Sequence, residues 1–264
     1  MNKSFKVVFN KARGALMVVN EVTSSVQAKG TKTVIAAAVA ALAASGAMAT
    51  EWVKAPEELK TVQEEQKWEV LKEGSSFAFV LDDKAEKKQG AFLAARTEGL
   101  TFDKDLWVSG NTSDAQATGI SAVKVKATNT GRIFVTSGKD GVSYQNHGMM
   151  AENGGTAVND GLIVAKNAYG MSVETAGPAS TLINNNRIVV EETGVGMELG
   201  GYSGSKAENH GTIVVGTPKT GEDVDGGLPR FGHGVLIKDT SKNIFTNYGT
   251  IEAATGATAI EVQK

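Results

Sequence analysis

One serine and three histidines carry the residue types from which a catalytic site could be built. Ser203 lies in the run Gly201-Tyr-Ser-Gly-Ser205. A serine nucleophile needs a histidine base and an orienting carboxylate within about 3 Å of one another. His147 and His210 both lie in Asn-His-Gly, which indicates a recurring corner of a repeated unit, and His233 lies in Phe-Gly-His-Gly. We interpret all four as loop or corner residues and predict no catalytic residue.

Metal binding is the other chemistry that the sequence could support. The run Gly221-Glu-Asp-Val-Asp-Gly-Gly227 offers three carboxylates to a calcium ion, but it has neither the spacing of an EF-hand nor that of a calcium-binding nonapeptide. Stacked histidines could also hold a metal, yet the chain has three histidines and no cysteine. We expect a solvated acidic turn, no metal site and no cofactor.

The charge distribution argues against one class of partner. The formal net charge is −2, but residues 1–49 carry six basic residues and one acidic residue. The remaining 21 basic and 28 acidic residues give −7 beyond residue 49. A chain of this sign has no broad field for a polyanion, so we expect no nucleic-acid partner.

A phrase that recurs five times organises the residues beyond 110. It follows the pattern Asn-x-Gly-x-Ile-x-Val with small variations. Its asparagine, glycine and isoleucine positions are Asn129, Gly131, Ile133, Asn159, Gly161, Ile163, Asn184, Ile188, Asn209, Gly211, Ile213, Asn247, Gly249 and Ile251. Self-similarity of this kind predicts a solenoid.

A second phrase, a glycine followed by alternating apolar residues, lies between these copies. It begins at Gly119, Gly141, Gly170, Gly196, Gly234 and Gly256, and the shortest steps suggest a base unit of 22 residues. The period of two indicates strands, and no helical period is sustained. We therefore predict an all-β fold, a parallel β-helix, with a β-sandwich as the alternative.

In such a solenoid, equivalent residues of successive coils lie about 4.8 Å apart. The five isoleucines of the first phrase are predicted to stack inside the coils. The five asparagines are predicted to form a corner ladder whose amides hydrogen-bond between coils.

The chain is divided into three parts by composition. Residues 1–49 are predicted to be an extended signal peptide, residues 50–109 an irregular N-terminal cap with the first coils, and residues 110–264 the β-helix repeats. Within the cap, a proline followed by acidic residues predicts a short helix over Pro56–Lys67.

The first 49 residues have the organisation of a cleaved signal peptide. A basic stretch precedes the apolar run Val34–Ala44, which is expected to be helical but too short to span about 30 Å of hydrocarbon. Ala47 and Ala49 supply the small side chains that signal peptidase requires, so cleavage is predicted after Ala49. Mass spectrometry of the exported protein should find Thr50 first, and an intact Met1 would contradict the signal peptide.

The thirty residues before the apolar run are more than a plain signal peptide needs. Residues 1–25, with Phe5-Lys-Val-Val-Phe-Asn-Lys-Ala-Arg-Gly-Ala15 and Val18-Val-Asn-Glu21, resemble the extended signal peptide region of type V secreted proteins of Gram-negative bacteria. Phe9 and Asn20 depart from the tryptophan and serine usual there. The repeats resemble the right-handed β-helix passengers of autotransporters. The segments typical of an outer-membrane β-barrel are not found in the sequence.

The resemblance implies a route and a role. The partners would be the inner-membrane export machinery, signal peptidase and the outer-membrane translocation machinery. The destination would be the outer membrane, the cell surface or the medium. It implies a passenger, or the N-terminal part of one, that serves adhesion or aggregation through a host or self surface ligand and is not an enzyme.

The alternative is a carbohydrate-active β-helix enzyme, a polysaccharide lyase or hydrolase. Such an enzyme needs acidic and basic residues clustered on one face. Charged repeat residues such as Glu198 and Lys238 do not recur in register, so the sequence predicts no such cluster.

Overall fold

A computed structural model describes residues 5–10, 15–20, 61–62, 76–81, 89–110, 115–137, 146–173, 177–200, 204–216, 232–238 and 242–263. The chain forms two compact units, Met1–Val53 and Lys54–Lys264. In the first unit, β1 (Phe5–Asn10) and β2 (Ala15–Asn20) pair antiparallel as sheet A. The apolar run Val34–Ala44, with its predicted helix, and the cleavage residues Ala47 and Ala49 lie outside the described residues.

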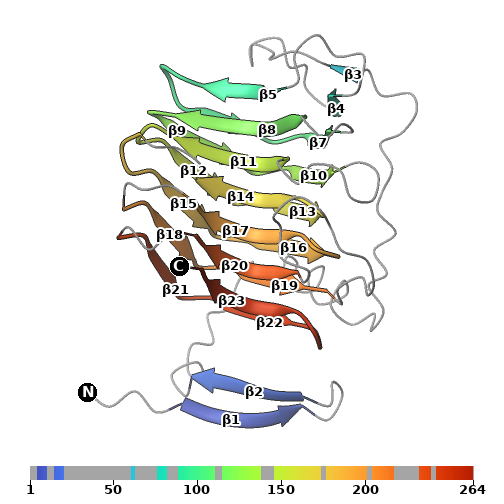
Figure 1. The fold of residues 1–264 in the computed structure, drawn as a ribbon, viewed down its shortest axis with the longest axis vertical. Coiled ribbons are helices and arrows are strands. Elements are labelled where there is room, and N and C mark those ends of the chain that lie inside the picture. Colours follow the sequence, from blue (N-terminus) through green and yellow to red (C-terminus); the bar gives the residue numbers. More distant parts are fainter. Residues whose placement is uncertain are drawn as a thin grey trace, which may run out of the picture. The chain divides into compact units, whose positions relative to one another are not determined.

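The second unit confirms the prediction of an all-β parallel β-helix. Its described strands stack into three sheets in which every neighbouring pair is parallel (Figure 1). Sheet B contains β3 (Thr61–Val62), β4 (Phe77–Leu81), β7 (Asp105–Gly110), β10 (Arg132–Ser137), β13 (Leu162–Lys166), β16 (Arg187–Glu191), β19 (Thr212–Val215) and β22 (Thr250–Ala253). Sheet C contains β5 (Gln89–Ala95), β8 (Gln116–Val123), β11 (His147–Glu152), β14 (Tyr169–Val173), β17 (Val195–Leu199), β20 (His233–Ile237) and β23 (Thr258–Val262). Sheet D contains β6 (Leu100–Phe102), β9 (Lys126–Asn129), β12 (Thr156–Asn159), β15 (Thr181–Asn184), β18 (Lys206–Asn209) and β21 (Ile244–Asn247).

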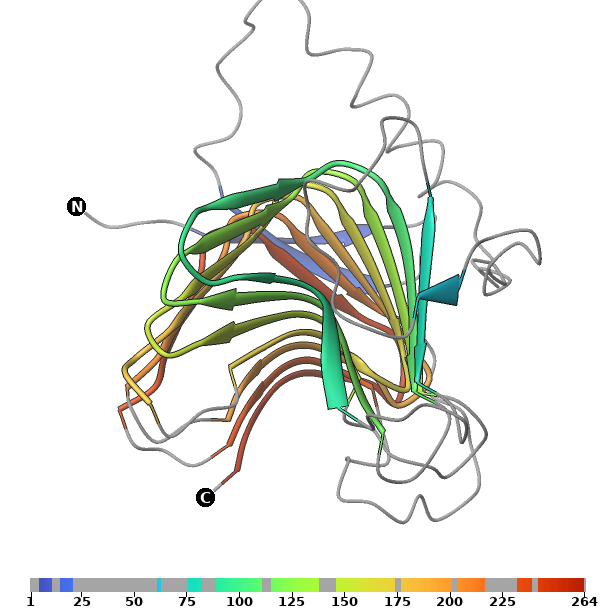
Figure 2. The same ribbon diagram turned by 90° about the horizontal axis from the view of Figure 1, so that it is seen from above.

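Each coil passes through sheets B, C and D in that order, and the strands of successive coils superpose when seen from above (Figure 2). The regular coils begin at β4, inside the segment predicted as cap and first coils. Because β3 pairs with β4, the short helix predicted over Pro56–Lys67 is wrong at Thr61–Val62. Both residues are β-branched, which favours a strand over a helix.

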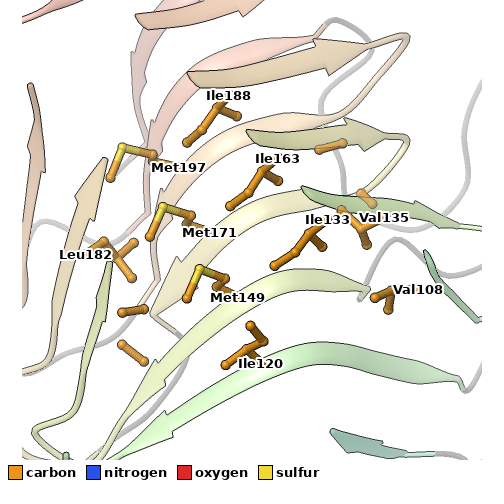
Figure 3. Packing of buried hydrophobic residues seen from close by; sticks show 14 of the residues in the cluster. Val108, Ile120, Ile133, Val135, Met149, Ile163, Met171, Leu182, Ile188 and Met197 are labelled. Carbon is orange, nitrogen blue, oxygen red and sulfur yellow. The ribbon is translucent and has the colours of Figure 1, made fainter. Parts of the chain in front are cut away.

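The core is built from columns of identical or similar side chains. Ile133, Ile163, Ile188 and Ile213 are adjacent in the register of sheet B and have no exposed surface, whereas Ile251 is half-buried. Sheet C supplies a facing column, seen in Figure 3 as Ile120, Met149, Met171 and Met197. Burying one such side chain contributes about 1.5–3 kcal/mol.

A column of glycines in sheet C lets neighbouring coils approach closely. Its members are Gly119, Gly148, Gly170, Gly196 and Gly234, and a Cβ atom on any of them would lie 2.5–2.7 Å from a carbonyl oxygen of the next coil. Two members of the second sequence phrase were therefore assigned wrongly. Gly148 takes the place predicted for Gly141, which itself lies outside the described residues. Ala259 takes the place predicted for Gly256, which lies instead in a turn at φ +85°.

The repeat length is corrected by the same register. Equivalent asparagines lie 25 residues apart both from Asn159 to Asn184 and from Asn184 to Asn209. A step of 25 residues therefore recurs, while other steps run from 22 residues (His147 to Tyr169) to 38 residues (Asn209 to Asn247). The predicted base unit of 22 rested on the two misplaced glycines.

Candidate functional site

The five repeat asparagines lie at the corner between sheets D and B, where each ends a sheet D strand. The side-chain amide of each of the first four donates to the amide oxygen of the equivalent asparagine in the next coil, and Asn247 donates to the Gly249 carbonyl. The Nδ2···Oδ1 distances from Asn129 through Asn159, Asn184 and Asn209 to Asn247 are 2.9, 2.8, 2.7 and 2.7 Å. The first four asparagines have no exposed surface and Asn247 is exposed. A fully partnered chain of buried amides holds the coils in register.

The glycines of the same phrase close the corner. The Gly131 amide donates to Asn129 Oδ1 over 3.1 Å, so the asparagine side chain also holds its own turn. A Cβ atom on Gly131, Gly161, Gly211 or Gly249 would lie 1.9–2.1 Å from a backbone oxygen of the preceding coil. Asn186 holds this place in the Asn184 coil, and its side chain donates to the Asp160 carbonyl.

Asn184→Ala should destabilise the solenoid by about 2 kcal/mol, because it leaves Asn159 Nδ2 and Asn209 Oδ1 without their amide partner in a buried corner. Urea unfolding followed by circular dichroism measures the change. Asn185→Ala, in the adjacent exposed residue, is the matched control and should change stability by less than about 0.5 kcal/mol. Equal effects of the two substitutions would contradict a structural ladder.

The face of sheet C opposite the core carries a group of polar and aromatic residues, here called the sheet C cluster: His147, Tyr169, Ser172, Glu198 and Lys238. The His147 and Tyr169 rings stack with centroids 5.1 Å apart, because these residues are neighbours in the register of β11 and β14. His147 Nδ1 lies 2.7 Å from Ser172 Oγ. Neither His147 nor Ser172 has exposed surface, and Tyr169 is 4% exposed.

Lys238 joins the aromatic and acidic parts of the cluster. Its ammonium nitrogen lies 2.7 Å from Glu198 Oε1, donates to the Tyr169 hydroxyl over 3.2 Å, and lies 5.4 Å from the centre of the Tyr169 ring. Burial raises the pKa of Glu198, and the Lys238 charge opposes that rise. Glu198 Oε2 has no hydrogen-bond partner among the described residues. The sequence placed Glu198 and Lys238 in no cluster, and the structure corrects this.

The Ser172–His147 contact has the separation of a nucleophile and its base. Burial, followed by the Lys238 charge, lowers the pKa of His147 to about 3, so the ring is neutral at physiological pH. A catalytic pair must also reach a substrate. Both side chains are fully buried, so a substrate in solution cannot reach the pair. The contact instead links β11 to β14.

The histidines that share Asn-His-Gly occupy different places, so their interpretation as equivalent corners is wrong. His147 begins β11 in sheet C, whereas His210 lies in the corner turn between β18 and β19. The counterpart of His147 three coils further on is His233, which begins β20 and contacts Glu261 through Nε2. The two Asn-His-Gly tripeptides therefore occupy different positions in their coils.

The stability of the protein should fall as the pH is lowered from about 6.5 toward 3 through His147. In the unfolded chain the histidine has its ordinary pKa near 6.5 and binds a proton in this pH range. The native ring, with a pKa of about 3, does not. The native state loses up to about 1.4 kcal/mol per pH unit in this window, and the contribution is fully present above it. Chemical unfolding at several pH values measures the slope.

His147→Gln should flatten that slope, because it removes the buried ring that the native state keeps neutral. The native pKa of Glu198 is raised, so protonation of Glu198 stabilises the native state as the pH falls, opposite to the effect of His147. The His147 contribution is therefore read from the difference between the variant and the wild type. Parallel pH profiles for the wild type and His147→Gln would contradict the buried neutral histidine.

Two sequence candidates, Ser203 and the acidic run 221–227, lie outside the described residues. Among the residues that the structure does describe, no group of three histidine or acidic side chains is placed to hold a metal ion. No helix in the described part of the chain is long and apolar enough to cross a membrane.

Comparison with known proteins identifies the N-terminal segment. Residues 1–50 match the family model described as the Extended Signal Peptide of Type V secretion system, which confirms the resemblance noted for residues 1–25. No curated protein and no solved structure matches the chain.

A signal peptide followed by a β-solenoid defines an exported solenoid protein. The extended form of that signal places it in type V secretion, as a secreted protein with a β-helical passenger. It enters the export machinery, meets signal peptidase, and passes through the periplasm to the cell surface or the extracellular space.

Proposed function

We propose that the β-solenoid is a non-catalytic passenger that serves adhesion or aggregation at the bacterial surface. The observation that supports this most directly is the burial of the sheet C cluster. Its serine, histidine, tyrosine and glutamate are each at most 4% exposed, so residue types that could do chemistry stabilise the stack of coils instead.

The corners of the solenoid support a binding role. They present at least one exposed side chain per coil on a backbone held by the asparagine ladder. A preorganised surface loses little conformational entropy on binding, which favours affinity.

The rival function is a polysaccharide lyase or hydrolase acting through the Glu198–Lys238 pair. Hydrolysis of a glycosidic bond ordinarily requires two carboxylates flanking that bond. Glu198 is the single carboxylate of the sheet C cluster and is 1% exposed, so the arrangement favours a structural ion pair.

The test uses the full chain exported from a Gram-negative host. Cells that export it are expected to settle by aggregation or to adhere to host-cell layers more than cells carrying the empty vector. The purified exported protein is incubated in parallel with neutral and acidic polysaccharides, and new reducing ends and unsaturated products are measured. We expect none. Cleavage that is lost in Glu198→Gln and retained in Glu98→Gln, the same substitution at an exposed carboxylate, would replace the proposal with the enzyme.

A further inference from the structure

The second residue of each Asn-x-Gly corner lies on the surface, one per coil. These residues form a single file along the solenoid, here called the turn ridge: Thr130, Asp160, Asn185, His210 and Tyr248. All five are exposed, whereas the asparagine before each of the first four is fully buried. The asparagine ladder therefore holds the backbone that displays the ridge.

Two pairs of neighbouring ridge members contact each other. Asn185 Nδ2 donates to Asp160 Oδ1 over 2.7 Å. The His210 and Tyr248 rings stack with centroids 4.8 Å apart and 16° between their planes, and His210 Nε2 lies 2.9 Å from Glu208 Oε2. Tyr248 is 68% exposed, the largest value among the exposed large hydrophobic residues. The ridge thus places aromatic rings beside carboxylate and amide groups.

We propose that the turn ridge binds a neutral polysaccharide along its length; this rests on the proposed function of adhesion and names its partner class. An aromatic ring packs against the apolar C–H face of a pyranose, as it does against other apolar groups. Carboxylate and amide groups pair with neighbouring hydroxyls, and Asp160 and Asn185 supply both within one contact.

The shape of the ridge favours a chain-like ligand over a protein surface. Its corners recur at the spacing of stacked strands, about 4.8 Å, so a polymer of repeated units meets a repeated row of side chains. A stable protein interface buries about 800 Å² on each partner around an apolar centre. A file one side chain wide, with the His210 and Tyr248 rings at one end and polar residues along the rest, does not supply such a centre.

Charge selects among polysaccharides. The ridge and the adjoining Glu208 contain two carboxylates and no lysine or arginine, and the chain beyond residue 49 carries a net charge of −7. An anionic glycan would be repelled. A neutral glycan forms the same hydrogen bonds without that repulsion.

The experiment measures binding of the exported full-length protein by calorimetry to dextran, mannan, galactan and xylan, with alginate as the anionic probe. We expect at least one neutral polymer to bind and alginate not to bind. Tyr248→Ala should lower the affinity for the polymer that binds at least tenfold. Tyr248→Phe keeps the ring, so its affinity should stay within twofold of wild type. Ile244→Ala is the matched control, because Ile244 is 52% exposed and begins β21, whereas Tyr248 follows the end of that strand. It too should stay within twofold.

The other outcomes separate the ridge from the proposed function. Adhesion that is unchanged in Tyr248→Ala, or that depends on a protein ligand and on no polysaccharide, overturns the ridge proposal and leaves the adhesive function in place. Equal losses in Tyr248→Ala and Ile244→Ala also overturn it, since they point to non-specific apolar contact. An exported chain that neither adheres nor aggregates removes the proposed function itself. Thermal melts establish that each variant is folded.

Discussion

Ile188→Asp should abolish the cooperative unfolding transition of the solenoid. Ile188 has no exposed surface and follows Ile163 in the core column of sheet B (Figure 3). Its neighbour in the next coil is Ile213. A carboxylate there would lose its hydration, and the core cluster around it is made of hydrophobic residues. The cost is several kcal/mol, comparable to the whole stability of an ordinary domain. Circular dichroism during urea unfolding and the yield of folded exported protein measure the effect.

Ile188→Val is the matched control, because it removes one methylene group and keeps the β-branched shape. It should cost about 1 kcal/mol and leave a cooperative transition. An aspartate variant that unfolds at the same urea concentration as the valine variant would show that the side chain does not face the core.

The repeat phrase predicted the inward-facing isoleucine column and the asparagine corner, because side chains in a strand alternate between its two faces. In the Asn-x-Gly-x-Ile-x-Val phrase the isoleucine and the valine both face the core, and the asparagine closes the preceding strand. Its Ile133 and Asn129 positions therefore recur with the register of sheets B and D. A column of identical residues at a fixed place in each coil leaves a periodic trace in the sequence.

The glycine column of sheet C was harder to predict because glycine serves two purposes in this chain. In the column it leaves room for a carbonyl oxygen of the next coil, and at Gly256 it permits a positive φ in a turn. Both uses precede alternating apolar residues, so sequence alone does not separate them. The predicted base unit of 22 residues rested on the misplaced Gly141 and Gly256, whereas a step of 25 residues recurs in the structure.

The sheet C cluster could not be predicted from spacing, because its contacts cross between coils. Lys238 meets Tyr169 across 69 residues, and His147 meets Ser172 across 25. No motif links residues of such different types, since each coil contributes one or two members. What could have indicated the cluster is the polar residue types within the second phrase, where Ser172 and Glu198 interrupt strands that are otherwise apolar.

Gly196→Ala should also destabilise the solenoid strongly, by about 3 kcal/mol. The added Cβ would lie 2.5 Å from the Gly234 carbonyl oxygen and 3.0 Å from Ile213 Cγ2, so it meets backbone on one side and core on the other. Neighbouring coils are joined by parallel hydrogen bonds along β14, β17 and β20, so β17 cannot retreat in either direction without breaking a ladder. Phe92 occupies the equivalent position in β5. There the described sheet ends, so β5 has one neighbouring strand and can shift away from it.

The control for that substitution is Gly90→Ala in β5. Its Cβ would meet only Phe79 Cζ, at an ordinary 3.7 Å, so we expect a change of less than about 1 kcal/mol, in the stabilising direction because glycine is unfavourable within a strand. Urea unfolding of both variants, with hydrogen exchange of the sheet C amides, measures the difference. If the glycine column sets the spacing of the coils, Gly196→Ala lowers the urea midpoint of unfolding. It also lowers the protection of the β14, β17 and β20 amides against hydrogen exchange. An alanine at 196 that leaves the midpoint and the protection of β20 unchanged would mean that the coils can separate locally at no cost, and that the glycine column does not set their spacing.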